Sequence, residues 1–397
     1  PSVKASVKIA GYQVTEAEIV ITFAEPIPVG VAAEVTIAHA AEPKEKGMYF
    51  RTPEMGYLEE DLHLFTQGEM HEHPHWFPSF DYPNERFSSE VICRVSPDLV
   101  VLSNGRLVSE EVDPATGLKA SRWVQEKPHV NYLIALVAGR MKSIEDRHRD
   151  ISLTFYTPAS QIDQAANSFE ETTAMMAFFE AEIGVPYPWV DYKQVAVDGF
   201  PWGGMENTTL TILTTRTLFT DATGNIRSGK NRNLIAHELA HQWFGDYLTC
   251  KDWSHIWLNE GFACYAEWLW FEAAGAETAD GAARRAHAKL ADLAQDLVIS
   301  DPGADLMFDD RLYKRGALTL HAVRLTIGDE PFFDLLRGWC AAYANACVTT
   351  ADFRRFVAEA GHDLEALLED WLDDGPLPSL PPGPGASKSS AKKKSSR

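Results

Sequence analysis

The chain has 397 residues, more than one hydrophobic core usually organises, and this length predicts two domains. A hydrophobic content of 45%, with 11 Trp, 12 Tyr and 20 Phe, excludes disorder over most of the chain. The formal net charge of −21 argues against nucleic acid as a partner, because phosphates repel an acidic surface.

Residues 1–142 form the first predicted domain, and their pattern is that of a β-sheet protein. Short runs rich in β-branched residues alternate with turn signals made of Pro, Gly, Asn and Asp. These runs cover residues 3–10, 17–24, 32–40, 88–95 and 131–139. We expect them to form a sandwich-like sheet domain.

Residues 143–378 form the second predicted domain, in which the hydrophobic period becomes mainly helical. Strand-like runs occur at 151–157, 193–200 and 208–215, and a helical pattern over 161–184 ends at Gly184. Further helices are predicted at residues 230–247, 258–274, 280–299, 313–327, 330–345, 350–360 and 363–373. A few strands followed by many helices predict the α+β fold class.

Residues 379–397 are predicted to be a flexible tail, Pro/Gly-rich and then Ser/Lys-rich. The Lys and Arg residues of this tail also permit a weak contact with a membrane or nucleic acid, but a solvated tail is the simpler interpretation.

The five cysteines are scattered and form no CxxC pair, so they predict neither a disulfide framework nor a thiolate metal site. No apolar run is long enough to span a membrane, and no signal peptide is recognisable. We expect a cytoplasmic protein without a membrane span.

The segment HELAHQWFGDYLTCKDWSHIWLNEG, residues 237–261, contains a candidate metal centre. His237 and His241 are four residues apart on a helical pattern, so they share one face of the helix. Glu238 lies beside the first histidine, where it can serve a metal-bound water. This HExxH spacing is typical of zinc metalloproteases, although two polar residues of a surface helix are the alternative for the pentad alone.

Glu260 lies near the start of the next predicted helix. If that helix returns antiparallel to the first, its carboxylate reaches the same ion. Alone, Glu260 would be interpreted as a charge favoured at a helix N-terminus. Together with His237 and His241 it completes a ligand set that leaves the fourth position open to water, as one catalytic Zn²⁺ requires.

Three further motifs accompany this segment: TQGE at residues 66–69, GGMEN at 203–207 and LYKRGAL at 312–318. With HELAHQWFGD and WLNEG, they resemble the gluzincin zinc aminopeptidases, the family of aminopeptidase N and leukotriene hydrolase. The resemblance covers roughly residues 35–378. It implies an N-terminal β-sandwich-like domain followed by a thermolysin-like, mainly helical zinc catalytic domain.

The resemblance also implies a function for each motif. The activity would be hydrolysis of the N-terminal peptide bond of peptides with a free N-terminus, with Glu238 as general base on a zinc-bound water. Tyr313 would donate to the oxyanion, and Glu69 and Glu206 would bind the α-ammonium group. The other substrate-binding residues implied by GGMEN are Gly203, Gly204, Met205 and Asn207.

The chain departs from the family pattern in three ways. Arg315 replaces the usual lysine and Asp246 the usual asparagine. The large C-terminal helical domain and part of the N-terminal β-domain are also missing, so we expect a fragment or a minimal member.

Two other functions remain open. One is a leukotriene-hydrolase-like epoxide hydrolase that uses the same zinc site, which the local motifs do not exclude. The other is a non-catalytic scaffold, against which the intact set of site residues argues.

Overall fold

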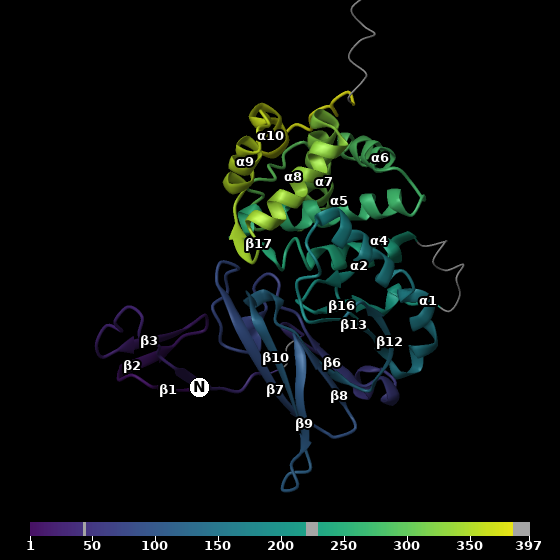
Figure 1. The fold of residues 1–397 in the computed structure, drawn as a ribbon. Helices are drawn as coiled ribbons and strands as arrows, with labels where there is room; N and C mark the ends of the chain where they lie inside the picture. Colours follow the sequence, from purple (N-terminus) through teal and green to yellow (C-terminus); the bar gives the residue numbers. More distant parts are fainter. Residues whose placement is uncertain (43–44, 220–228, 384–397) are drawn as a thin grey trace, which may run out of the picture.

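The structure, a computed structural model, describes residues 1–42, 45–219 and 229–383 (Figure 1). Of the predicted tail, only residues 379–383 are described, and the prediction for its Ser/Lys-rich part lies outside the described residues. Among the helices of the described segments, none combines the length and the apolar composition that crossing a bilayer requires.

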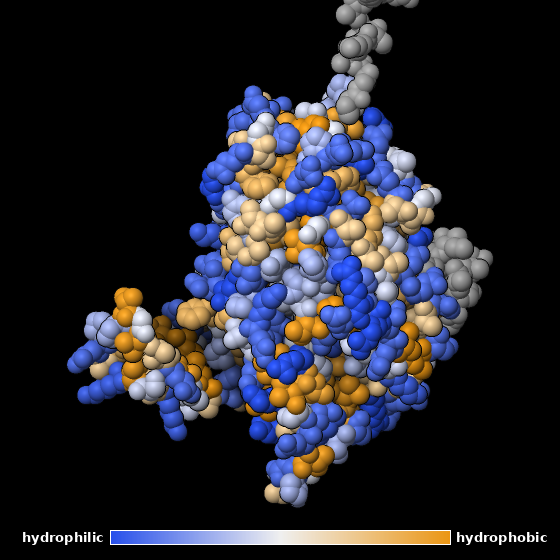
Figure 2. Space-filling view, viewed as in Figure 1, coloured by the Kyte–Doolittle hydropathy of each residue, from blue (hydrophilic) through white to orange (hydrophobic). Residues whose placement is uncertain are grey.

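The first part of the chain is built from β-strands, as predicted. Two short antiparallel pairs come first, β1 (Ser2–Ala5) with β4 (Val35–Ala38) and β2 (Ile9–Val14) with β3 (Ile19–Phe23). They extend to one side of the molecule (Figure 1), and Figure 2 shows apolar surface on this part. Tyr12, Val14 and Val20 are among its exposed apolar residues.

Two larger sheets follow in the β-rich part, one of four strands in the order β5-β6-β11-β8 and one of three in the order β7-β10-β9. Their strands are β5 (Met48–Arg51), β6 (His63–Thr66), β7 (Arg86–Val95), β8 (Val100–Ser103), β9 (Arg106–Val112), β10 (Lys119–Val130) and β11 (Leu136–Gly139).

The run 131–139, predicted as one strand, begins instead with a 3-10 turn at Asn131–Leu133. The side chain of Asn104 explains the interruption. Its amide donates to the carbonyl of Leu133 at 2.8 Å and accepts from the backbone N–H of Ala135 at 2.7 Å. These two hydrogen bonds pair backbone groups that a neighbouring strand would otherwise pair. Tyr132 therefore lies in the 3-10 turn, before the first residue of β11.

A five-stranded sheet in the order β12-β13-β14-β16-β15 opens the second part. Its strands are β12 (Met141–His148), β13 (Ile151–Pro158), β14 (Asp191–Val197), β15 (Gly204–Met205) and β16 (Leu210–Thr214). The central strands β14 and β16 run parallel and are almost wholly buried. The boundary expected at residues 142–143 falls inside β12.

The helices pack together on one side of the sheets (Figure 1). They are α1 (Ala165–Phe169), α2 (Thr172–Ile183), α4 (Gly229–His241), α5 (Trp257–Ala273), α6 (Ala279–Ala291), α7 (Asp310–Ile327), α8 (Asp329–Ala342), α9 (Thr350–Glu359) and α10 (Glu365–Leu372). α5 is buried over nearly its whole length, which makes it the central helix. The predicted order, a β-rich part followed by a mainly helical part, is confirmed.

Three predicted helices differ most from their expected bounds. The helix predicted at 161–184 is divided into a 3-10 segment, α1 and α2, although it does end at Gly184. The helix predicted at 280–299 ends at Ala291. The helix predicted at 230–247 ends at His241, because the chain turns at Gly245, whose φ of 134° is rarely adopted by other residues. The strand β17 (Leu248–Cys250) then pairs with β18 (Ala346–Val348).

Candidate metal centre and substrate cavity

α4 and α5 bring three potential metal ligands together. Nε2 of His237 lies 3.0 Å from Nε2 of His241 and 3.1 Å from Oε2 of Glu260, and His241 Nε2 lies 3.4 Å from the same oxygen. Ligand atoms about 2.0–2.1 Å from one tetrahedral zinc ion lie about 3.3 Å from each other. The spacing therefore fits a single zinc ion.

The opposite ring nitrogens of both histidines are held by acceptors. Nδ1 of His237 lies 2.9 Å from Oε1 of Glu267, and Nδ1 of His241 lies 2.8 Å from the carbonyl oxygen of Phe244. An acceptor at Nδ1 places the proton there and leaves Nε2 with a free lone pair for a metal. The donor set and its tautomers thus fit zinc chemically as well as in spacing.

A close helix crossing brings Tyr313 to this centre. A Cβ atom on Gly261 of α5 would lie 2.8 Å from the Cα atom of Gly316 of α7, so neither position has room for a side chain. The two helices can approach this closely only because both residues are glycine. As a result the ring of Tyr313 stacks on that of His237, with 6.0 Å between the ring centroids.

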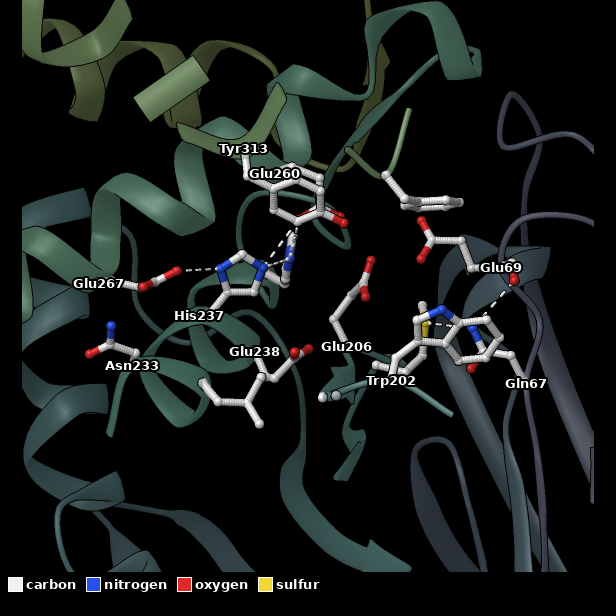
Figure 3. A pocket seen from close by; sticks show the side chains of 16 residues that line it. Gln67, Glu69, Trp202, Glu206, Asn233, His237, Glu238, Glu260, Glu267 and Tyr313 are labelled. Atoms are coloured by element: carbon white, nitrogen blue, oxygen red, sulfur yellow. Dashed lines mark hydrogen bonds and ion pairs between the residues drawn. The ribbon is translucent and has the colours of Figure 1, made fainter. Parts of the chain in front are cut away.

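A cavity of about 410 Å³ opens over the metal centre (Figure 3). Its lining contains the predicted residues Glu69, Gly203, Gly204, Met205, Glu206, His237, Glu238, His241, Glu260 and Tyr313. Of the predicted site residues, only Asn207 is not part of this lining, and it is fully buried. Motifs separated by more than two hundred residues in the sequence therefore meet in one place.

Glu238 lies in the cavity wall against the backbone of the GGMEN segment. A Cβ atom on Gly204 would be 2.3 Å from Oε1 of Glu238, so a side chain at this position would displace the carboxylate. Oε2 of Glu238 has no hydrogen-bond partner among the described residues. Burial raises the pKa of Glu238 to about 8, against the opposing effect of the two histidines.

Glu69 and Glu206 face the cavity from different parts of the chain. Glu69 follows β6 of the β-rich part, whereas Glu206 follows the edge strand β15. Carboxylate oxygens of Glu69, Glu206 and Glu260 all lie within 4.8 Å of one another. Burial and the neighbouring carboxylates raise the pKa of Glu69, and burial raises that of Glu206. No lysine or arginine of the described residues forms an ion pair with either carboxylate, so the pair is open to a cationic ligand.

Glu267 is a site residue that the sequence analysis missed. It lies across the cavity from Glu69 and contacts His237 (Figure 3). It follows Glu260 by seven residues in α5, and this two-turn spacing is a signal that would have placed both carboxylates on one face of the helix. Lys314, next to Tyr313, lowers the pKa of Glu267 against the effect of burial and so favours the carboxylate form.

Arg315, which replaces the family's lysine, does not face the cavity. Its guanidinium is buried and donates to the carbonyl of Trp371 at 2.8 Å and to that of Asp370 at 3.1 Å. It also contacts the carbonyls of Asp374 and Gly375. This arginine therefore joins α7 to the end of α10.

Two family descriptions match the chain. The Peptidase M1 N-terminal domain matches residues 2–133, and the Peptidase family M1 domain matches residues 167–371, which include the whole candidate metal centre. The chain belongs to peptidase family M1. The resemblance to the zinc aminopeptidases that the motifs indicated is thus confirmed at the level of the family.

Two curated aminopeptidases are moderately similar to this chain in sequence. Aminopeptidase M1 of Arabidopsis thaliana is 29% identical over 374 residues, which cover 89% of this chain and 41% of the plant protein. Probable aminopeptidase 2 of Sulfurisphaera tokodaii is 27% identical over 325 residues, which cover 78% of this chain and 41% of the archaeal protein. The chain spans about two fifths of the length of these curated relatives.

Solved M1 structures share the fold. The M1 zinc metallopeptidase of Deinococcus radiodurans, as a variant bound to the substrate Tyr-Ser-Ala, has a TM-score of 0.80 and 24% identity and covers 96% of this chain and 85% of that one. The structure of the unsubstituted D. radiodurans enzyme has a TM-score of 0.79 to this chain. At this identity the likeness establishes the arrangement of a β-rich part followed by a helical part.

Proposed function

We propose that the chain is a zinc-dependent aminopeptidase that hydrolyses the N-terminal peptide bond of peptides with a free amino terminus. The observation that supports this most is the placement of Glu69 and Glu206 in the same cavity as the His237, His241 and Glu260 ligand set. Paired carboxylates beside a hydrolytic centre suit an ammonium group at a fixed distance from the scissile bond. The binding of Tyr-Ser-Ala by the D. radiodurans enzyme supports peptides as the substrate class.

His237, His241 and Glu260 would hold the zinc ion. When bound, zinc supplies Lewis-acid chemistry, because it polarises a carbonyl group and lowers the pKa of water.

Glu238 would move the proton in this reaction. It takes a proton from the attacking water and delivers it to the nitrogen of the leaving amine, so that one proton is transferred as the C–N bond breaks. Its Oε2 atom has no hydrogen-bond partner among the described residues, so it is available to the attacking water.

Tyr313 would stabilise the carbonyl oxygen as it becomes negative. Burial, followed by the effect of Glu260, raises the pKa of its phenol, so the hydroxyl stays protonated and can donate a hydrogen bond. One such donor at a developing oxyanion typically contributes about 3 kcal/mol. Glu69 and Glu206 would meanwhile hold the α-ammonium group, which limits cleavage to the first peptide bond.

A matched pair of fluorogenic substrates tests this proposal. We expect a zinc-loaded sample to hydrolyse aminoacyl amides with a free amine, and a chelator to abolish this activity until zinc is restored. The N-acetylated forms should react at least ~100-fold more slowly, because they offer no cation to the two carboxylates. Equal rates on both forms would contradict the proposed recognition of the amine. Hydrolysis of neither form by the zinc-loaded protein would favour a scaffold instead.

We also propose a cytoplasmic location. All five cysteines are free thiols, as is usual in reducing compartments. Fractionation of the producing cells tests this, and recovery outside the cytoplasmic fraction would contradict it.

A further inference from the structure

Tyr132 contacts both chain segments that carry the carboxylates to which the proposed function assigns the ammonium group. Its backbone carbonyl would be 2.3 Å from a Cβ atom on Gly68, the residue before Glu69. Its phenol donates to Oε1 of Glu206 at 3.2 Å. One buried residue of the β-rich part thus contacts both the loop that carries Glu69 and the carboxylate of Glu206.

The direction of the phenol hydrogen bond is fixed by a chain of partners. The backbone N–H of Cys250 donates to Oδ1 of Asn259 at 3.0 Å, which determines the orientation of that side-chain amide. The Nδ2 atom of Asn259 then donates to the phenol oxygen of Tyr132 at 3.2 Å. Since the phenol accepts from Asn259, its single hydrogen is available to Glu206.

The phenol remains a donor throughout the neutral range. Burial, followed by the effects of Glu206 and Glu69, raises the pKa of Tyr132 well above its ordinary value. A donor at Oε1 stabilises the ionised form of Glu206 against the desolvation that otherwise favours the neutral acid. Tyr132 does not line the cavity, so it acts on a ligand only through Glu206.

We propose that Tyr132 is a positioning residue for amine recognition, whose phenol holds the carboxylate of Glu206 at the distance from Glu69 that a substrate ammonium group requires. This inference rests on the proposed function. The β-rich part then contributes two residues to amine recognition: Glu69 itself, and Tyr132 as the support for Glu206. A role of this kind affects the binding of the amine and leaves the metal centre unchanged.

Direct binding of two zinc-directed ligands tests the inference. One ligand is a phosphinic pseudodipeptide with a free amine, and the other is the same compound with hydrogen in place of the amino group. We expect Tyr132→Phe to reduce the preference for the amine roughly 10-fold, the size of a lost hydrogen bond to a charged group. The affinity for the ligand without the amine should change less than ~2-fold, because the aromatic contact with Trp253 is kept.

Tyr192→Phe is the matched control. It removes another buried phenol hydroxyl, which contacts Thr211 at 2.9 Å and is not part of the cavity lining, so the preference for the amine should remain. A double-mutant cycle with Glu206→Gln is the second test. In the Glu206→Gln background, Tyr132→Phe should have no further effect on the preference for the amine.

The outcomes separate this inference from the proposed function. An unsubstituted protein that prefers the amine, with a Tyr132→Phe variant that prefers it equally, overturns the inference and leaves the aminopeptidase proposal intact. An equal loss of affinity for both ligands, with a lowered melting temperature, assigns Tyr132 a structural role and also overturns it. No preference in the unsubstituted protein contradicts amine recognition itself, and this inference with it.

Discussion

Glu267 illustrates how a residue outside the ligand set can determine metal affinity. Its contact with Nδ1 of His237 fixes the tautomer that presents Nε2 to the metal. We expect Glu267→Gln to weaken zinc binding about 10- to 100-fold, measured by competition with a chelating dye. Glu272→Gln, on the same helix but paired with Arg324, should keep the original affinity. Unchanged zinc affinity in Glu267→Gln would show that the tautomer is fixed in another way.

Glu238 is the second residue with a separable role. Glu238→Gln keeps the shape of the side chain but cannot accept a proton, so kcat should fall about 10²- to 10⁴-fold. Zinc content should be unchanged, because the carboxylate is not one of the three atoms grouped around the proposed ion. The measurement is kcat on a free-amine substrate together with the metal-to-protein ratio, and retention of full activity would refute the assignment.

At the residue scale, local patterns predicted the candidate metal site. Site residues that are brought in by long-range contacts could not be predicted from local patterns. His237, Glu238 and His241 share a single helix, so their spacing alone specifies their geometry. Glu69 and Tyr313 were found only through the family resemblance. Tyr132 could not be found in either way, because its position depends on a 3-10 turn that is held by Asn104, from the distant turn between β8 and β9.

At the element scale, the crossing of α5 and α7 determines the position of Tyr313 relative to Glu260. Gly261→Ala would raise helix propensity by about 1 kcal/mol, but the added methyl group would overlap the backbone of Gly316. Overpacking of this kind costs about 1–3 kcal/mol and moves the helices apart. A displacement of about 1 Å at a reacting centre can lower the rate about 10²-fold, so we expect reduced kcat together with a lower melting temperature.

Gly281→Ala in α6 is the control for this crossing. The nearest atom to its Cβ would be Oγ1 of Thr278 at 3.1 Å, a contact that needs only a small shift, and α6 contributes no residue to the cavity lining, so activity should be nearly unchanged. Equal activities of the Gly261→Ala and Gly281→Ala variants would contradict the role of the crossing.

The positions of the helices were easier to predict than their ends. Apolar periodicity gave the existence of α5 and α7, because each buries one or more faces over several turns. The end of α4 before the turn at Gly245, and the break between α1 and α2, leave no mark in apolar periodicity.

At the scale of the whole molecule, the two parts share one continuous hydrophobic core, which includes Phe65 of β6 and Trp257 of α5. Arg86 of β7 joins them further, since its guanidinium donates to Oγ1 of Thr249 at 2.8 Å and contacts the carbonyl of Asp246. The sequence predicted both parts and their order. It did not predict this contact, because no local pattern pairs residues so far apart.

His129 lies buried beside this link, and its titration should weaken the molecule in acid. Burial, followed by the charge of Arg86, lowers the pKa of His129 to about 3, whereas the ordinary value in the unfolded chain is 6.5. Between these values the unfolded state binds more protons than the folded state. The stabilising contribution of the neutral ring is therefore complete above pH 6.5 and is lost progressively as the pH falls towards 3.

The variant His129→Gln removes this titration while keeping a polar side chain next to Ser89. Between about pH 7.5 and about pH 5, the free energy of unfolding of the unsubstituted protein should fall by about 2 kcal/mol more than that of the variant. Urea denaturation followed by tryptophan fluorescence measures this difference. His39→Gln, at an exposed histidine, should follow the unsubstituted protein. If His129→Gln shows the same dependence on pH as the unsubstituted protein, protonation of His129 does not govern the loss of stability of the molecule in acid.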